Sequence, residues 1–145
     1  MSALSLLFCV GCSDGRPPAF PARGKVVFPT GSPVHVGTVE LKSREHGIQA
    51  RGEIQNDGTF VLSTYREGDG AVAGFHDAVV VQIVVAEEVQ GHRPSKLGVV
   101  HPRYARYATS GLEVEVKPAG GNELIIQVDG LVAVKPGDES KPHGH

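Results

Sequence analysis

The sequence predicts an all-β domain in which seven antiparallel strands form a two-layered sandwich. The 145 residues include 19 glycines and 10 prolines, a composition that favours many turns. Apolar and polar residues alternate in several short segments, and no long segment has the spacing of an amphipathic helix. Residues 79–86 are almost all apolar and mostly β-branched, as expected for a central strand covered on both faces. An eight-stranded barrel is the alternative architecture.

The expected strands follow one another at short intervals within a domain that spans residues 23–131. They are residues 24–28, 38–42, 48–54, 59–63, 79–86, 112–117 and 124–128. The sequence Asn56-Asp57-Gly58 indicates a hairpin, because these residues tolerate positive φ angles. The glycine-rich residues 67–74 predict a tight turn before the central strand. A further turn at residues 118–121 predicts that the last two strands pair as a hairpin, and no helix is expected to cover the sheets.

The N-terminal residues resemble a bacterial lipoprotein signal. Residues 3–11 are apolar and too few to span a bilayer, and the small Gly11 stands directly before Cys12. The resemblance implies cleavage before Cys12, attachment of diacylglycerol to its sulfur and acylation of its amine. The signal peptide would then be residues 1–11.

Two features depart from that signal. No Lys or Arg precedes the apolar segment, and Cys9 stands where an aliphatic residue is usual. The alternative is the buried or disordered apolar N-terminus of a cytosolic protein. Under the lipoprotein interpretation, the proline-containing residues 12–22 are a tether between membrane and domain, and the polar residues 132–145 are a disordered tail.

Several segments, taken together and in order, carry a family resemblance. They are residues 24–28, 56–62, 68–74, 101–104 and 109–116. Across residues 23–129 the chain resembles the carboxypeptidase regulatory-like (transthyretin-like) β-sandwich domain of planctomycete-type bacterial lipoproteins. The resemblance implies an immunoglobulin- or prealbumin-like fold and a location in the cell envelope. It implies no catalytic residues, because these domains usually act as adhesive, scaffolding or accessory modules.

Composition and motifs argue against nucleic-acid binding, a disulfide framework and the common classes of enzyme. A net charge of −2 and a pI near 6.4 give no general attraction to nucleic acid. Both cysteines lie near the N-terminus, so a disulfide framework is excluded. The sequence has no Gly-x-Ser-x-Gly elbow, no phosphate-binding loop, no dinucleotide-binding fingerprint and no zinc-hydrolase motif. We therefore predict neither an enzyme nor a bound cofactor.

The candidate surface for a partner or ligand lies in the long segment of residues 87–111. Its basic and aromatic residues suit an anionic glycan or the acidic surface of an envelope protein. The residues of this candidate surface are Arg93, Lys96, Arg103, Arg106 and Tyr107. In the alternative interpretation, Tyr104, with or without Tyr107, packs onto the sandwich and the charged groups are solvated.

Two groups of residues raise the question of a metal. Asp57, Glu67 and Asp69 carry oxygen ligands that suit Ca²⁺, although acidic residues are ordinary in turns and we favour the turn interpretation. His143 and His145 could bind a transition metal, or could belong to a solubilising tail. We predict no metal site.

These observations favour a non-catalytic, lipid-anchored β-sandwich that faces the periplasm or the cell exterior. We expect it to bind the membrane through its lipid and to serve as a structural or protein-interaction module. The alternative is an extracytoplasmic protein that binds glycan or metal through residues 87–111 or the histidine tail. A hydrolase of unrecognised type is the third hypothesis.

Overall fold

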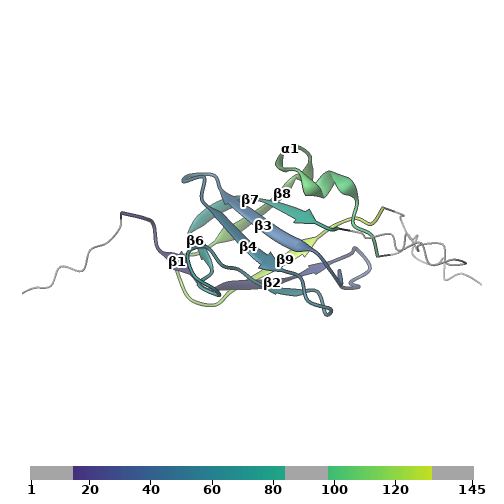
Figure 1. The fold of residues 1–145 in the computed structure, drawn as a ribbon, viewed down its shortest axis with the longest axis horizontal. Coiled ribbons are helices and arrows are strands. Elements are labelled where there is room, and N and C mark those ends of the chain that lie inside the picture. The colour runs from purple at the N-terminus through teal and green to yellow at the C-terminus, as the bar shows by residue number, and fades with distance from the viewer. Residues whose placement is uncertain (1–14, 84–97, 132–145) are drawn as a thin grey trace, which may run out of the picture.

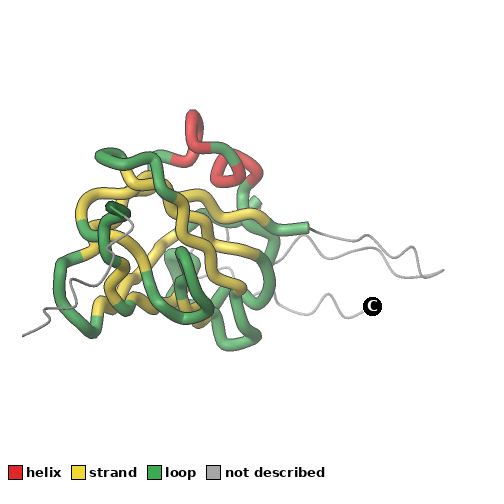
Figure 2. The backbone as a smooth tube through the Cα atoms, turned by 60° about the vertical axis from the view of Figure 1, so that its left-hand side comes forward, coloured by secondary structure: helices red, strands yellow, loops and turns green. Residues whose placement is uncertain are grey.

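The computed structural model describes residues 15–83 and 98–131, which are mostly β structure (Figure 1). The strands are β1 (Ala19–Phe20), β2 (Ala22–Val27), β3 (Thr38–Ser43), β4 (Gln49–Glu53), β5 (Thr59–Val61), β6 (Ala71–Val72), β7 (Gly74–Val81), β8 (Leu112–Val116) and β9 (Asn122–Gln127). Two short helices lie between β7 and β8 in the chain, the 3₁₀-helix η1 (Pro102–Ala105) and α1 (Tyr107–Ser110). Figure 2 shows both helices along one side of the strands.

Two sheets pack around one hydrophobic core. One has the order β5-β2-β9 and the other the order β4-β3-β7-β8, while β1 and β6 form a separate two-stranded sheet. Val26 and Phe60 of the first sheet belong to the same buried cluster as Leu41 and Val80 of the second. The alternating apolar residues of the sequence therefore face inward, between the sheets.

The described part of the chain has two distinct ends. At the near end, which we define as residues 15–22, 43–48, 65–74 and 116–122, the strands β2, β7 and β9 begin. There the Asn122 N–H donates to the Pro21 carbonyl at 3.2 Å. At the far end, which comprises residues 27–38, 54–58, 81–83, 98–101 and 128–131, the same strands finish. The chain leaves the described region at residues 83 and 131 and returns to it at residue 98, and all three positions lie at the far end.

The ordered domain begins before residue 23, where we expected it to start. β1 and the first residue of β2 fall within the supposed tether of residues 12–22, and Phe20 packs against the core. Phe20 explains why the ordered domain begins so early, because its ring gives this proline-rich segment an apolar anchor on the core. The expected signal peptide and tail, residues 1–11 and 132–145, lie outside the described residues.

The central strand is β7, and it lies earlier in the chain than residues 79–86. Gly74 opens the strand instead of closing a turn, and β6 stands where the turn was expected. The strand finishes before Gln82, whose side-chain amide donates to the Val36 carbonyl at 3.1 Å. The expectation that both faces are covered is confirmed for residues 78–80, which are all buried, and η1 and α1 contact β7. The helices themselves were not predicted.

The expected hairpin between the last two strands is wrong. β8 pairs with β7 in antiparallel fashion, whereas β9 pairs with β2 in parallel fashion in the other sheet. The side chain of Asn122 organises the connection, since it accepts from the Lys117 N–H at 2.9 Å and donates to the Lys117 and Ala119 carbonyls. The connection thus carries the chain from one sheet to the other. The prediction that all strands are antiparallel fails at the β2–β9 pair.

Candidate functional site

The structure describes three of the five residues of the candidate partner surface. Arg103 lies in η1, Arg106 follows it, and Tyr107 opens α1. Predicted residues that lie outside the described ranges are Cys12, Arg93, Lys96, His143 and His145.

Arg103 is bonded within the domain. Its Nη2 donates to Asp129 Oδ2 at 2.8 Å and to the Tyr104 hydroxyl at 2.5 Å. The bond to Tyr104, together with the negative charge of Asp129, raises the pKa of Arg103 above its ordinary value. Tyr104 is only 4% exposed and belongs to the core, which confirms that it packs onto the sheets. Arg103 therefore fastens η1 to the segment after β9, and part of its hydrogen-bonding capacity is already used.

Tyr107 lies on the outer face of the four-stranded sheet. Its hydroxyl donates to Glu40 Oε1 at 2.8 Å, and Arg51 Nη2 donates to Glu40 Oε2 at 2.7 Å. The bond from Arg51 is the main reason that the pKa of Glu40 lies below its usual range, although partial burial opposes the shift. Burial and the neighbouring Glu40 raise the pKa of Tyr107. The phenol is thus held neutral and bonded to the sheet.

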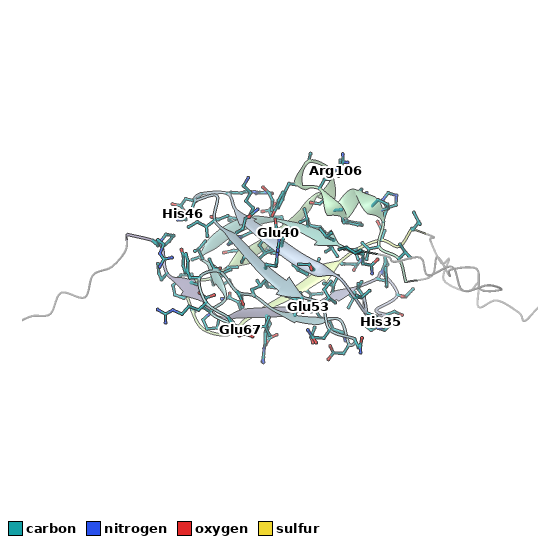
Figure 3. All side chains as sticks on the ribbon, viewed as in Figure 1. His35, Glu40, His46, Glu53, Glu67 and Arg106 are labelled. Atoms are coloured by element: carbon teal, nitrogen blue, oxygen red, sulfur yellow. The ribbon has the colours of Figure 1, made fainter. Side chains whose placement is uncertain are left out.

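Of the three described members of the candidate surface, Arg106 is the one that points into solvent (Figure 3). Within the described ranges, its guanidinium forms no hydrogen bond or ion pair. The structure does not gather Arg103, Arg106 and Tyr107 into one site, since Arg103 bonds to Asp129 beyond β9 whereas Tyr107 bonds to Glu40 on β3.

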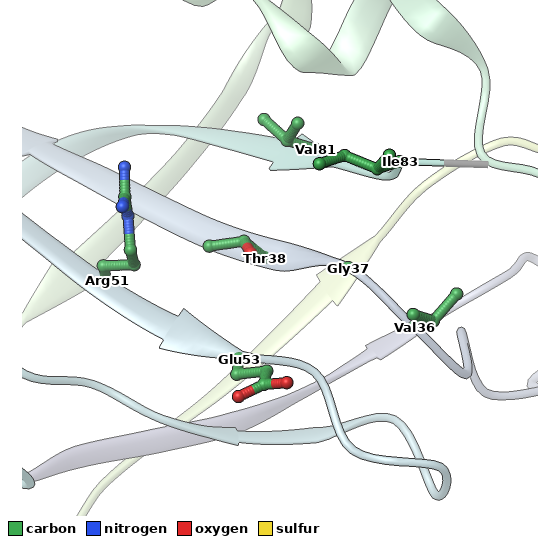
Figure 4. Close-up of a pocket in the computed structure, with 7 residues that line it drawn as sticks. All are labelled: Val36, Gly37, Thr38, Arg51, Glu53, Val81 and Ile83. Atoms are coloured by element: carbon green, nitrogen blue, oxygen red, sulfur yellow. The ribbon is translucent and has the colours of Figure 1, made fainter. Parts of the chain in front are cut away.

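An open groove of about 360 Å³ crosses the outer face of the four-stranded sheet at the far end (Figure 4). Its lining consists of Val36, Gly37, Thr38, Arg51, Glu53, Val81 and Ile83. Val36 is 57% exposed and Ile83 is 80% exposed, so two apolar side chains stand in solvent at one side. Arg51 and Glu53 add one charge of each sign. This arrangement offers a contact surface for an apolar group flanked by charges.

The acidic turn residues Asp57 and Asp69 accept hydrogen bonds from the backbone of their own turns. The carboxylate of Asp57 accepts from the backbone N–H and the hydroxyl of Thr59, at 3.1 and 2.6 Å. Asp69 accepts from the N–H groups of Thr64, Tyr65 and Arg66 at 2.7 to 3.0 Å. Although burial opposes the shift, these three bonds hold the pKa of Asp69 below its usual range. The turn interpretation is confirmed for both residues, and the described ranges contain no cluster of three or more side chains suited to a metal.

Sequence reasoning missed that residues 16–20 dock onto the domain, at Tyr65 and β6. The Tyr65 hydroxyl donates to the Pro17 carbonyl at 2.8 Å, and the Arg16 guanidinium lies 4.4 Å from the centre of the Tyr65 ring. β1 then pairs with β6, and Gly70 lies so close to Phe20 that a Cβ on Gly70 would overlap the Phe20 carbonyl oxygen. Phe20 was the available signal, because a free tether has no need of an aromatic residue.

A buried histidine was also missed. His76 is fully buried, and its Nε2 lies 2.7 Å from the Val72 carbonyl oxygen, which only accepts. Nε2 therefore carries the proton, and among the described residues Nδ1 has no partner. Burial lowers the pKa of this imidazole, against the opposing effects of the Val72 bond and Asp77.

No family model, curated protein or solved structure matches the chain. The family resemblance of residues 23–129 therefore remains a prediction. Among the described residues, no helix has the length and apolar character needed to cross a membrane.

Proposed function

We propose that the chain is a non-catalytic protein of the bacterial cell envelope, anchored by a lipid on Cys12. Its domain is a β-sandwich of immunoglobulin or prealbumin type, related to the carboxypeptidase regulatory-like domains, and it faces the periplasm or the cell exterior. There it serves as a structural or protein-interaction module.

The observation that carries this proposal is the order of features at the N-terminus. An apolar segment finishes at Gly11, Cys12 follows at once, and the chain docks onto the domain from Arg16 onward. This order suits a removable signal, an acylation site and a short link to a folded domain. Two sheets that share one core support the sandwich part of the proposal.

The bonding of the charged residues supports a module over a glycan-binding protein. Arg103 and Tyr107 already use their polar groups on Asp129 and Glu40. A bound glycan would have to replace these bonds. Arg103 and Tyr107 therefore give little support to the alternative in which residues 87–111 bind a glycan. Arg106 is the described candidate that is open to an acidic partner.

Fractionation of cells tests the proposal. Cys12→Ser is expected to move the protein from the membrane to the soluble fraction and to abolish metabolic labelling with palmitate. Two or three acyl chains hold a protein stably, since each buried CH₂ contributes about 0.8 kcal/mol. Cys9→Ser is the matched control and should remain labelled and membrane-bound. Membrane association that survives Cys12→Ser would contradict the lipid anchor.

A further inference from the structure

We propose that the near end of the sandwich faces the lipid surface and that the far end, with the groove, points away from it. This orientation rests on the proposed lipid attachment at Cys12. It goes beyond attachment, because a lipid on a long free tether would leave the domain free to turn.

The first reason is the short distance along the chain between the lipid and the docked residues. Four Cα–Cα steps separate Cys12 from Arg16, and an extended chain covers at most about 14 Å in that number of steps. Arg16 and Pro17 are in turn held by Tyr65, through the ring contact and the hydrogen bond at 2.8 Å. The supposed eleven-residue tether of residues 12–22 is thus reduced to a few residues before Arg16.

The second reason is that the docking site is itself well braced. The Asp69 carboxylate fixes the backbone of residues 64–66, and the Thr64 hydroxyl donates to the Gly70 carbonyl at 2.7 Å. Gly70 has a φ of +96° and packs against Phe20, while β1 pairs with β6. Residues 16–20 therefore cannot swing away without breaking several contacts.

The third reason is the length of the sandwich compared with that of the free link. Eight residues in β7 span about 26 Å from the near end to the far end. With residues 16–20 docked, a link of about 14 Å is too short for the domain to stand with its far end on the membrane and its near end about 26 Å away. Phe75, the second residue of β7, follows the near end directly; it is 50% exposed and suits the boundary between lipid and water. The groove at Val36 and Ile83 then opens toward a partner outside the membrane.

Energy transfer to a labelled bilayer tests the orientation. Because the lipid blocks Cys12 and cleavage removes Cys9, an introduced cysteine would be the one reactive thiol of the mature chain. We would label His46→Cys at the near end and Asn56→Cys at the far end, both exposed (Figure 3 labels His46 and, beside the Asn56 turn, His35). The full-length lipidated protein is placed in vesicles of phosphatidylethanolamine and phosphatidylglycerol that carry a headgroup acceptor.

We expect transfer from the His46→Cys label to exceed that from the Asn56→Cys label by at least about twofold, since the ends lie about 26 Å apart. An insertion of about 20 Gly and Ser residues between Asp14 and Gly15 is the control, because such a linker spans about 25 Å and frees the domain to turn. In that variant the difference should disappear. Tyr65→Ala, which removes the contacts to Arg16 and Pro17 and so lengthens the free link, should reduce it.

The two proposals fail in different ways. Palmitate-labelled protein with equal transfer from both positions would overturn the orientation and leave the lipid anchor standing. Purified protein without lipid would overturn the anchor and the orientation together.

Discussion

The hydroxyl group of Tyr104 donates a hydrogen bond to the Asp129 carboxylate and accepts one from the Asp129 N–H, each at 3.1 Å. A second bond joins the same two segments, because the His101 N–H donates to the Asp129 carbonyl at 3.0 Å. Together these bonds fasten η1 to the chain that follows β9. They close the core at the far end.

Removal of the Tyr104 ring should destabilise the domain strongly. Tyr104→Ala is expected to lower the free energy of unfolding by about 2–4 kcal/mol, through lost burial and a cavity. Tyr104→Phe, which keeps the ring, should lower it by only about 1 kcal/mol, the cost of the lost hydrogen bonds. Urea unfolding of both variants measures the difference. Equal loss in the two variants would show that the hydroxyl, and not the ring, carries the stabilisation.

The two arginines beside Tyr104 should behave differently. Arg103→Ala is expected to lower the melting temperature, because it removes the bonds to Asp129 and Tyr104. Arg106→Ala should leave the melting temperature unchanged and should weaken binding of any acidic partner, since its charge lies in solvent. Thermal melts and pull-down from envelope fractions give the two measurements. Unchanged recovery of partners by Arg106→Ala would remove this residue from the candidate surface.

Alanine variants of Gly70 and Gly74 distinguish the cost of a close contact from the cost of backbone strain, because both glycines have positive φ angles and only Gly70 has close neighbours. Gly74 has a φ of +117° with open space around it, so Gly74→Ala should cost on the order of 1–3 kcal/mol from strain alone. Gly70→Ala adds an overlap with the Phe20 carbonyl to a similar strain and should cost more. Chemical unfolding ranks the two variants. The reverse order would mean that residues near Phe20 move aside easily, contrary to the rigid docking of residues 16–20.

Because of His76, the free energy of unfolding of the domain should fall as the solution becomes acidic. Burial lowers its pKa in the folded state, whereas the unfolded chain binds a proton with a pKa near 6.5. The unfolded state therefore takes up the proton first, so the contribution of His76 is full above about pH 6.5 and is lost as the pH falls below it. His76→Gln retains a donor for the Val72 carbonyl and removes the titration. Unfolding from about pH 7.5 to about pH 5 should show a steeper decline in the wild type than in His76→Gln; parallel declines would contradict the buried neutral imidazole.

The inward-facing residues could be predicted because their signal is local. Val39 and Leu41 alternate with polar neighbours, and Phe60 and Leu62 stand two residues apart in a segment flanked by Thr59 and Ser63; all four are buried. Tyr104 could be placed in the core for a similar reason, since a long segment needs an apolar anchor.

Strand partners and docking contacts depend on residues far apart in the sequence. The chain around residues 118–121 has a turn composition, but nothing local shows that β9 joins β2 across the core. Likewise, residues 16–20 resemble a tether because their partners, Tyr65, Gly70 and β6, lie about 50 residues later. The position of β7 was misjudged because His76 and Asp77 are polar, although pairing with β3 and β8 holds them in the strand.

The mass of the N-terminal peptide of the membrane-purified protein tests the central claim most directly. If Cys12 is the anchor, the mature chain begins at that residue and its first peptide carries diacylglycerol, with a further acyl group on the amine. A chain that retains residues 1–11, with an unmodified Cys12, would contradict the lipid-anchored account.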